Sequence, residues 1–211
     1  SFANEIVAKG LNNKKWLVDS INTEYSENIT DKHGSLDFHK FRFMKTYFLV
    51  YKVLFSKVIY ITIGQSFFGV LKYAPFILFA KLFKKTLVVH LHGNHLLNEY
   101  NSLKGLKKII FAKLITKFNH GIVLSDSLKS NLTPFIKPQN IHILFNFVED
   151  KLIVSEKELD KRKDFSEIKI FFMSNLLEEK GINILLNAIK KLNSENTFIK
   201  VKIAGTKILG N

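Results

Sequence analysis

The residues best suited to chemistry fall in two short segments, and the first surrounds His92. An apolar stretch, Val88–Leu91, runs directly into His92, Gly93 and Asn94. A His at the carboxyl end of a buried strand can donate to a hydroxyl or steer a proton, and an adjacent Gly lets the backbone approach a ligand. We therefore expect His92 to be a catalytic residue, with Gly93 and Asn94 lining a substrate cleft.

The second segment, Ile170–Gly181, combines an apolar strand, a short polar loop and the start of a helix at Ile182. Asn175 lies at the end of the strand, and Lys180 and Gly181 lie at the mouth of the helix. Free N–H groups at a helix N-terminus, together with a Lys, form a natural site for an anion such as phosphate. We expect Asn175, Lys180 and Gly181 to bind a phosphorylated ligand.

The histidine cluster also permits a different interpretation. His90, His92 and His95 form a His-x-His-x-x-His pattern that resembles the metal-binding motif of metallo-β-lactamase-like hydrolases. In that motif a carboxylate stands where this chain has Asn94, and the chain contains no Cys. Neutral imidazoles suit zinc, so a metallohydrolase remains an alternative, but we expect no metal site and no cofactor.

Two further positions follow predicted strands. Gln65 and Ser66 come just after Val58–Ile63, where they could line the same cleft or only turn the chain. Asn146 comes just after Ile141–Leu144, as a turn residue or a residue of an interdomain cleft. All three are candidate cleft residues, because open α/β sheets bind ligands at the carboxyl ends of their strands.

The elements that must position these residues alternate between strand and helix. Such alternation predicts an α/β fold with a parallel sheet and helices on both faces. The expected strands are Trp16–Ile21, Val58–Ile63, Thr86–His92, Gly121–Leu124, Ile141–Leu144, Ile168–Ser174 and Phe198–Ala204. The expected helices are Phe2–Leu11, Phe38–Phe55, Phe67–Phe83, Leu96–Phe118, Asp126–Phe135 and Ile182–Ser194, with Thr23–Asp37 a loop.

A change in composition predicts two domains. The stretch Glu149–Glu167 is the most charged part of the chain and is typical of a linker. We place the first domain at residues 1–150 and the second at residues 151–211. Because only two strands follow the linker, we expect both domains to be incomplete, with sequence missing at both ends.

The net charge of +14 is uneven, with +10 in residues 1–150. This balance favours anionic partners. Phe38–Phe55 interleaves Lys and Arg with aromatic residues, a pattern that fits docking on an anionic membrane surface as well as a core helix with long Lys stems. No nucleic-acid motif is present, so we expect no nucleic-acid partner. The absence of Cys suits a reducing compartment, and no signal peptide is visible.

Four motifs in order resemble family 4 glycosyltransferases of the GT-B fold. They are His92-Gly93, the strand ending at Ser125, Asn146-Phe147-Val148-Glu149, and the segment Phe171–Gly181. In that family the corresponding segments read approximately His-Gly, a strand ending in Ser, Pro-Asn-Gly-Val-Asp, and Gly-Arg-Leu…Glu-Lys-Gly. The resemblance covers the chain from about Val58 onward.

The resemblance implies two Rossmann-like domains and a retaining, metal-independent transfer of a sugar from a nucleotide-sugar to a glycan or lipid-linked acceptor. It implies that Lys180 stabilises the leaving phosphate and that His92 contacts the transferring sugar or the acceptor. It further suggests cell-surface polysaccharide biosynthesis in the cytoplasm, at the inner face of the membrane. One departure is that the family's Arg, five positions before the Lys, is Asn175 here. A non-catalytic anion- or membrane-binding module is therefore a further alternative. The family's Gly-rich loop and its carboxylate pair are expected beyond the two ends of this sequence.

Overall fold

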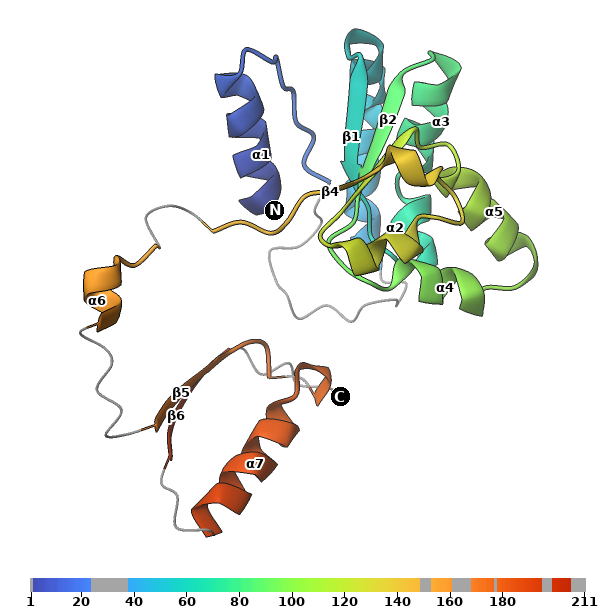
Figure 1. Cartoon of the computed structure of the whole chain (residues 1–211). Coiled ribbons are helices and arrows are strands. Elements are labelled where there is room, and N and C mark those ends of the chain that lie inside the picture. The colour runs from blue at the N-terminus through green and yellow to red at the C-terminus, as the bar shows by residue number, and fades with distance from the viewer. Residues whose placement is uncertain are drawn as a thin grey trace. The chain divides into compact units, whose positions relative to one another are not determined.

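The computed structural model describes residues 2–23, 38–148, 153–160, 168–176, 178–194 and 199–205. The chain divides into two compact units, Ser1–Asn146 and Phe147–Asn211 (Figure 1). The division predicted from the sequence lies a few residues further on, after Asp150.

The first unit is built on a four-stranded sheet within the described residues. All neighbouring strands are parallel, in the order β1-β2-β3-β4. The strands are β1 (Val58–Thr62), β2 (Thr86–His90), β3 (His120–Val123) and β4 (Ile141–Ile143). The parallel α/β class predicted from the alternating elements is therefore confirmed.

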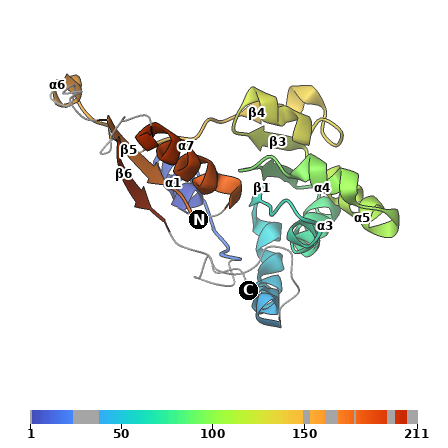
Figure 2. The same ribbon diagram turned by 90° about the horizontal axis from the view of Figure 1, so that it is seen from below.

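Helices lie on both sides of this sheet. Figures 1 and 2 show α1 (Phe2–Asn13) on one side, and α3 (Ala74–Leu82) and α5 (Gly105–Ile115) on the other. Asn4 of α1 donates from Nδ2 to Oγ1 of Thr62 at 3.0 Å, which ties α1 to the end of β1. The remaining helical elements of this unit are η1 (Phe38–Phe55), α2 (Phe67–Leu71), α4 (Leu96–Ser102), η2 (Asp126–Asn131) and η3 (Pro138–Asn140), where η denotes a 3₁₀ helix.

The core of the first unit lies between the sheet and the α3–α5 side. Leu87, Val89 and Leu91 alternate along the chain and are completely buried, as are Ile77 of α3 and Phe111 of α5. Side chains two apart on a strand share one face. The residues between them, including Val88 and His90, therefore belong to the opposite face of the sheet, on the side of α1.

Two helices predicted as continuous are each broken into a pair. The predicted helix Phe67–Phe83 is interrupted between Leu71 and Ala74, because Pro75 lacks an N–H group and starts a new helix instead. The predicted helix Leu96–Phe118 is interrupted before Gly105, whose φ of +55° is a left-handed conformation that favours glycine.

The predicted strand Trp16–Ile21 is wrong. The segment has no regular secondary structure, and Trp16 and Leu17 are exposed. Asp19 instead forms an ion pair with Lys52 of η1 at 2.8 Å. The predicted helix Asp126–Phe135 is also shorter, since η2 ends at Asn131. Phe38–Phe55 is helical over the predicted span, with 3₁₀ geometry, and most of the predicted loop Thr23–Asp37 lies outside the described residues.

The second unit contains a small parallel pair of strands with one covering helix. Strands β5 (Ile168–Met173) and β6 (Ile199–Ala204) are paired along their whole length, and α7 (Ile182–Ser194) lies alongside them (Figure 2). The predicted β-α-β unit is therefore confirmed. The short elements η5 (Glu178–Lys180) and α6 (Glu156–Asp160) complete this unit, while residues 149–152 and 161–167 of the predicted linker lie outside the described part.

No helix in the described parts of the chain has both the length and the apolar character that crossing a bilayer requires.

Candidate functional site

The first candidate site lies at the carboxyl end of β2. Leu91 is completely buried just after the strand and anchors the chain in the core, and the next residue, His92, is exposed. The ring of His92 lies against that of His90, with 4.1 Å between the ring centroids. The two rings therefore lie on the same side of the chain, as residues two apart on an extended strand do. The two histidines differ in accessibility, because His90 is only 3% exposed.

The environment favours neutral imidazoles at this position. Burial, and to a smaller extent the neighbouring His92, lowers the pKa of His90 to about 4. Burial also lowers the pKa of His92, the more exposed of the two rings. The ring nitrogen Nδ1 of His90 hydrogen-bonds the hydroxyl of Tyr60, whose pKa burial raises to about 12. At neutral pH both rings are uncharged, and a neutral imidazole can both donate and accept a hydrogen bond.

Two buried polar atoms beside this pair have no hydrogen-bond partner among the described residues. They are Nε2 of His90 and Oδ1 of Asn4. Asn4 bonds Thr62, and Thr62 is the register partner of His90 across the β1–β2 ladder. The two atoms thus belong to one neighbourhood under α1. Such groups are uncommon in proteins and cost stability, so they mark a position that packing alone does not explain.

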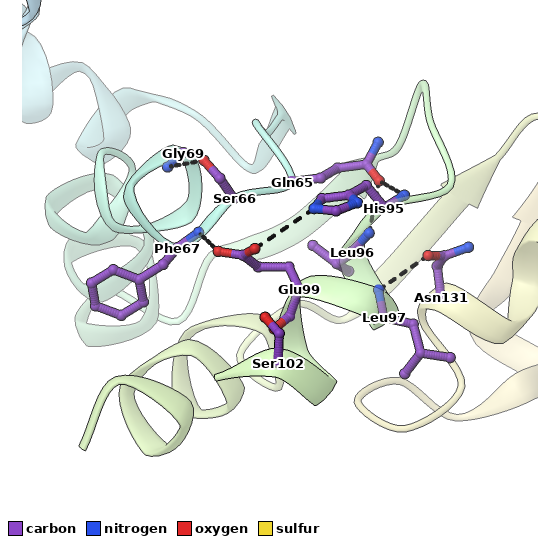
Figure 3. Close-up of polar contacts among 10 residues, drawn as sticks. All are labelled: Gln65, Ser66, Phe67, Gly69, His95, Leu96, Leu97, Glu99, Ser102 and Asn131. Atoms are coloured by element: carbon purple, nitrogen blue, oxygen red, sulfur yellow. Dashed lines mark hydrogen bonds and ion pairs between the residues drawn. The ribbon is translucent and has the colours of Figure 1, made fainter. Parts of the chain in front are cut away.

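Gln65 and Ser66 fix the loops at this edge of the sheet (Figure 3). Oε1 of Gln65 accepts hydrogen bonds from the backbone N–H groups of His95 and Leu96, at 2.6 and 2.9 Å. Oγ of Ser66 accepts one from Gly69, and so caps α2. These contacts satisfy N–H groups that a helix N-terminus would otherwise leave without an acceptor.

Glu99 of α4 completes this network of loop contacts (Figure 3). Its Oε1 accepts a hydrogen bond from the N–H of Phe67 at 2.7 Å, and its Oε2 lies 3.6 Å from Nε2 of His95. Asn131 of η2 accepts another from Leu97 at 3.1 Å. The turns after β1, β2 and β3 are therefore joined by side-chain contacts into one scaffold for His92.

Gly93 and Asn94 lie at the turn between β2 and α4. Gly93 lies against Gln65, since a Cβ atom added to Gly93 would meet the side-chain amide nitrogen of Gln65, which would have to shift. Asn94 is exposed. Nε2 of His95 is directed to Oε2 of Glu99 (Figure 3). Within the described ranges, no group of three or more His, Cys, Asp or Glu residues is arranged to hold a metal ion.

The second candidate site is the turn between β5 and α7. Ser174 continues the ladder by donating its N–H to the carbonyl of Ala204 at 3.1 Å, and Asn175 follows, half-buried. Gly181 has a φ of +82°, a conformation that disfavours any side chain, and donates its N–H to the carbonyl of Glu178. Lys180 is exposed immediately before the first turn of α7, whose N–H groups have no intrahelical acceptor.

Asn146 follows β4 and is exposed at the end of the first unit. Leu144 still belongs to the sheet edge, since its N–H donates to the carbonyl of Val123 at 2.9 Å.

No protein-family model matches the sequence. A comparison with curated proteins finds no match either.

The first unit brings together most of the predicted cleft residues. Gln65, Gly93 and His92 share one edge of the sheet, and Ser66 caps the neighbouring helix. Three contributors were missed by sequence reasoning: Tyr60, Glu99 and Asn131. Tyr60 and His90 belong to one face of neighbouring strands, a signal that strand alternation could have supplied. Nothing in the sequence pairs Glu99 or Asn131 with the loops they bind.

Proposed function

We propose that the protein is a glycosyltransferase that moves a sugar from a nucleotide-sugar donor to a glycan or lipid-linked acceptor, with two GT-B-type domains. The single observation that carries this proposal is common to both units. Each is a parallel α/β unit, and in each the predicted chemical residues follow the carboxyl end of a strand: His92 after β2, and Asn175 after β5, ahead of Lys180. Open parallel sheets bind their ligands at that end.

The turn between β5 and α7 supports binding of the donor diphosphate. The exposed Lys180 supplies one positive charge, and the start of α7 supplies N–H groups that lack an acceptor within the helix and the positive end of the helix dipole. Negative charge grows on the leaving diphosphate as the bond to the sugar breaks. Fixed cations and N–H groups aimed at that charge lower the barrier to transfer.

The edge around His92 supports binding of the transferring sugar or the acceptor. Its neutral imidazole suits hydrogen bonds to hydroxyl groups, and the network of Gln65 and Glu99 holds the surrounding loops in place. In this proposal Gly93 and Asn94 contact substrate through backbone and amide groups, and Asn146 lies near the hinge. No residue is assigned to a metal, and the reaction retains the configuration of the sugar.

We assign the reaction to cell-surface polysaccharide biosynthesis at the cytoplasmic face of the membrane, where lipid-linked acceptors are found. The excess of Lys and Arg in the first unit supports an anionic membrane partner there.

A set of nucleotide-sugars tests this function. The protein, expressed with its natural ends, is incubated with each donor in the presence of a chelator, and release of nucleoside diphosphate is measured. We expect at least one donor to be consumed. If every nucleotide-sugar remains intact with acceptor lipids and glycans present, the proposal fails.

The second candidate function is a non-catalytic module that binds anionic ligands. The observation that favours it is Asn175, which leaves Lys180 as the cation of the β5–α7 turn where the resembling family has an Arg–Lys pair. This candidate predicts that a nucleotide-sugar binds, with protection of the turn in hydrogen exchange, while no nucleoside diphosphate is released.

A further inference from the structure

The segment of the first unit that contains α3 and α5 is strongly basic. Between Lys57 and Ser125 the sequence contains ten lysines, no arginine and one carboxylate, that of Glu99. This carboxylate is engaged by the N–H of Phe67 and by His95. It is therefore directed to the loop network and does not neutralise the lysines of α5.

Large aliphatic side chains project from the same two helices. Leu106 and Ile109 of α5 are 70% and 51% exposed, and Leu82 of α3 is 72% exposed. Leu106, Ile109 and Lys113 are spaced at i, i+3 and i+7, which places them on one stripe of α5. We call the exposed residues of these helices the α3–α5 face: Leu78, Leu82, Leu106, Lys107, Ile109 and Lys113.

A shallow apolar hollow of about 510 Å³ adjoins this face. It is lined by Tyr100, Gly105, Lys108, Ile109, Ala112 and Lys113. Nζ of Lys108 lies 4.6 Å from the centroid of the Tyr100 ring, so a cation already covers the aromatic surface in the hollow. The edge of the same ring packs against Phe135.

We propose that the α3–α5 face docks the protein on the surface of a bilayer that contains anionic phospholipids. Aliphatic side chains enter the boundary between headgroups and acyl chains, while the surrounding lysines approach the lipid phosphates. Charge complementarity selects this partner, because apolar side chains flanked by lysines match a surface that is negative outside and apolar beneath.

Single-stranded nucleic acid fits this face less well. Proteins that bind it stack bases on exposed aromatic rings. On α5 the exposed apolar residues are aliphatic, and the ring of Tyr100 is covered by Lys108.

Co-sedimentation with vesicles tests the proposal. The probes are vesicles of phosphatidylcholine alone and of phosphatidylcholine mixed with phosphatidylglycerol. We expect the protein to bind the mixed vesicles, and binding to weaken as salt rises. The double variant Lys107→Gln/Lys113→Gln should bind at least tenfold more weakly, on the basis of about fivefold per lysine. Leu106→Gln/Ile109→Gln should weaken binding while leaving the charge unchanged.

The matched control is Lys190→Gln/Lys191→Gln, which removes two exposed lysines from α7. This control should bind as the unaltered protein does. Equal binding to both kinds of vesicle, equal losses in the α5 and α7 variants, or binding to single-stranded RNA without binding to vesicles would overturn the proposal. The assay contains no sugar donor, so its failure leaves the proposed transferase activity standing, and the reverse also holds.

Discussion

At the scale of single residues, the two histidines after Val89 have the same side chain but differ in burial. His90 is enclosed, with its Nδ1 bonded to Tyr60, and His92 is exposed at the edge. The two rings lie against each other, yet only His92 is exposed.

The lowered pKa of His90 predicts a specific loss of stability in acid. Its folded pKa of about 4 lies below the ordinary value of 6.5, so the unfolded chain binds the proton first as the pH falls. The contribution of neutral His90 to the free energy of unfolding is fully present above pH 6.5. It is lost as the pH falls from 6.5 to 4, and the loss reaches about 3 kcal/mol at pH 4. His90→Gln should flatten this part of a urea-unfolding profile against pH. An unchanged slope would show that His90 does not titrate on unfolding.

Lys180 is the residue on which donor chemistry depends in our proposal. Lys180→Ala removes the positive charge beside the leaving diphosphate and should lower kcat/KM for donor turnover on the order of a hundredfold to a thousandfold. The measurement is a steady-state assay of nucleoside diphosphate release. Lys190→Ala, on the exposed side of α7, is the control and should keep full activity. Equal activity in the two variants would remove Lys180 from the site.

At the scale of elements, the turns after the strands depend on side chains from other turns. Gln65, after β1, binds the start of α4, and Glu99 of α4 binds the start of α2. The two contacts are reciprocal, so the loops after β1 and β2 should lose order together if either is removed.

Gln65→Ala tests this coupling. The substitution leaves two N–H groups of α4 without their acceptor and should lower the free energy of unfolding by about 1–3 kcal/mol. Urea unfolding measures the change. Gln139→Ala alters an exposed Gln of η3 in the same unit, and should change stability by less than about 0.5 kcal/mol. Losses of the same size in both variants would contradict a specific role for Gln65.

Element prediction succeeded where the pattern was local. β1, β2 and β5 are apolar runs long enough to be read as strands, and α7 follows its helical periodicity. Prediction was wrong for Trp16–Ile21, since a strand needs a neighbouring strand and the local pattern carries no information about one. The helix breaks before Ala74 and Gly105 each depend on one residue, Pro75 and Gly105. Each residue lies within a long apolar stretch that was predicted as one continuous helix.

At the scale of the whole molecule, the parallel α/β class follows from the alternation of elements, and His92 and Gly93 follow from residue type at a strand end. The contacts of Glu99, Asn131 and Tyr60 join residues about 30 positions apart. Helix and strand periodicity relate residues only a few positions apart, so a single sequence does not indicate such pairs. The position of His92 and Gly93 at a strand end was therefore predictable, but the side-chain contacts that hold the surrounding loops were not.

The central claim is that the protein transfers a sugar from a nucleotide-sugar without a metal ion. The most direct measurement supplies the protein, expressed with its natural ends, with a donor labelled in its sugar, lipid-linked and glycan acceptors, and a chelator. Our account predicts that label appears in an acceptor with the configuration of the sugar retained, and that Lys180→Ala loses this transfer. An acceptor that stays unlabelled with every nucleotide-sugar, or transfer that stops when the chelator is added, would contradict it.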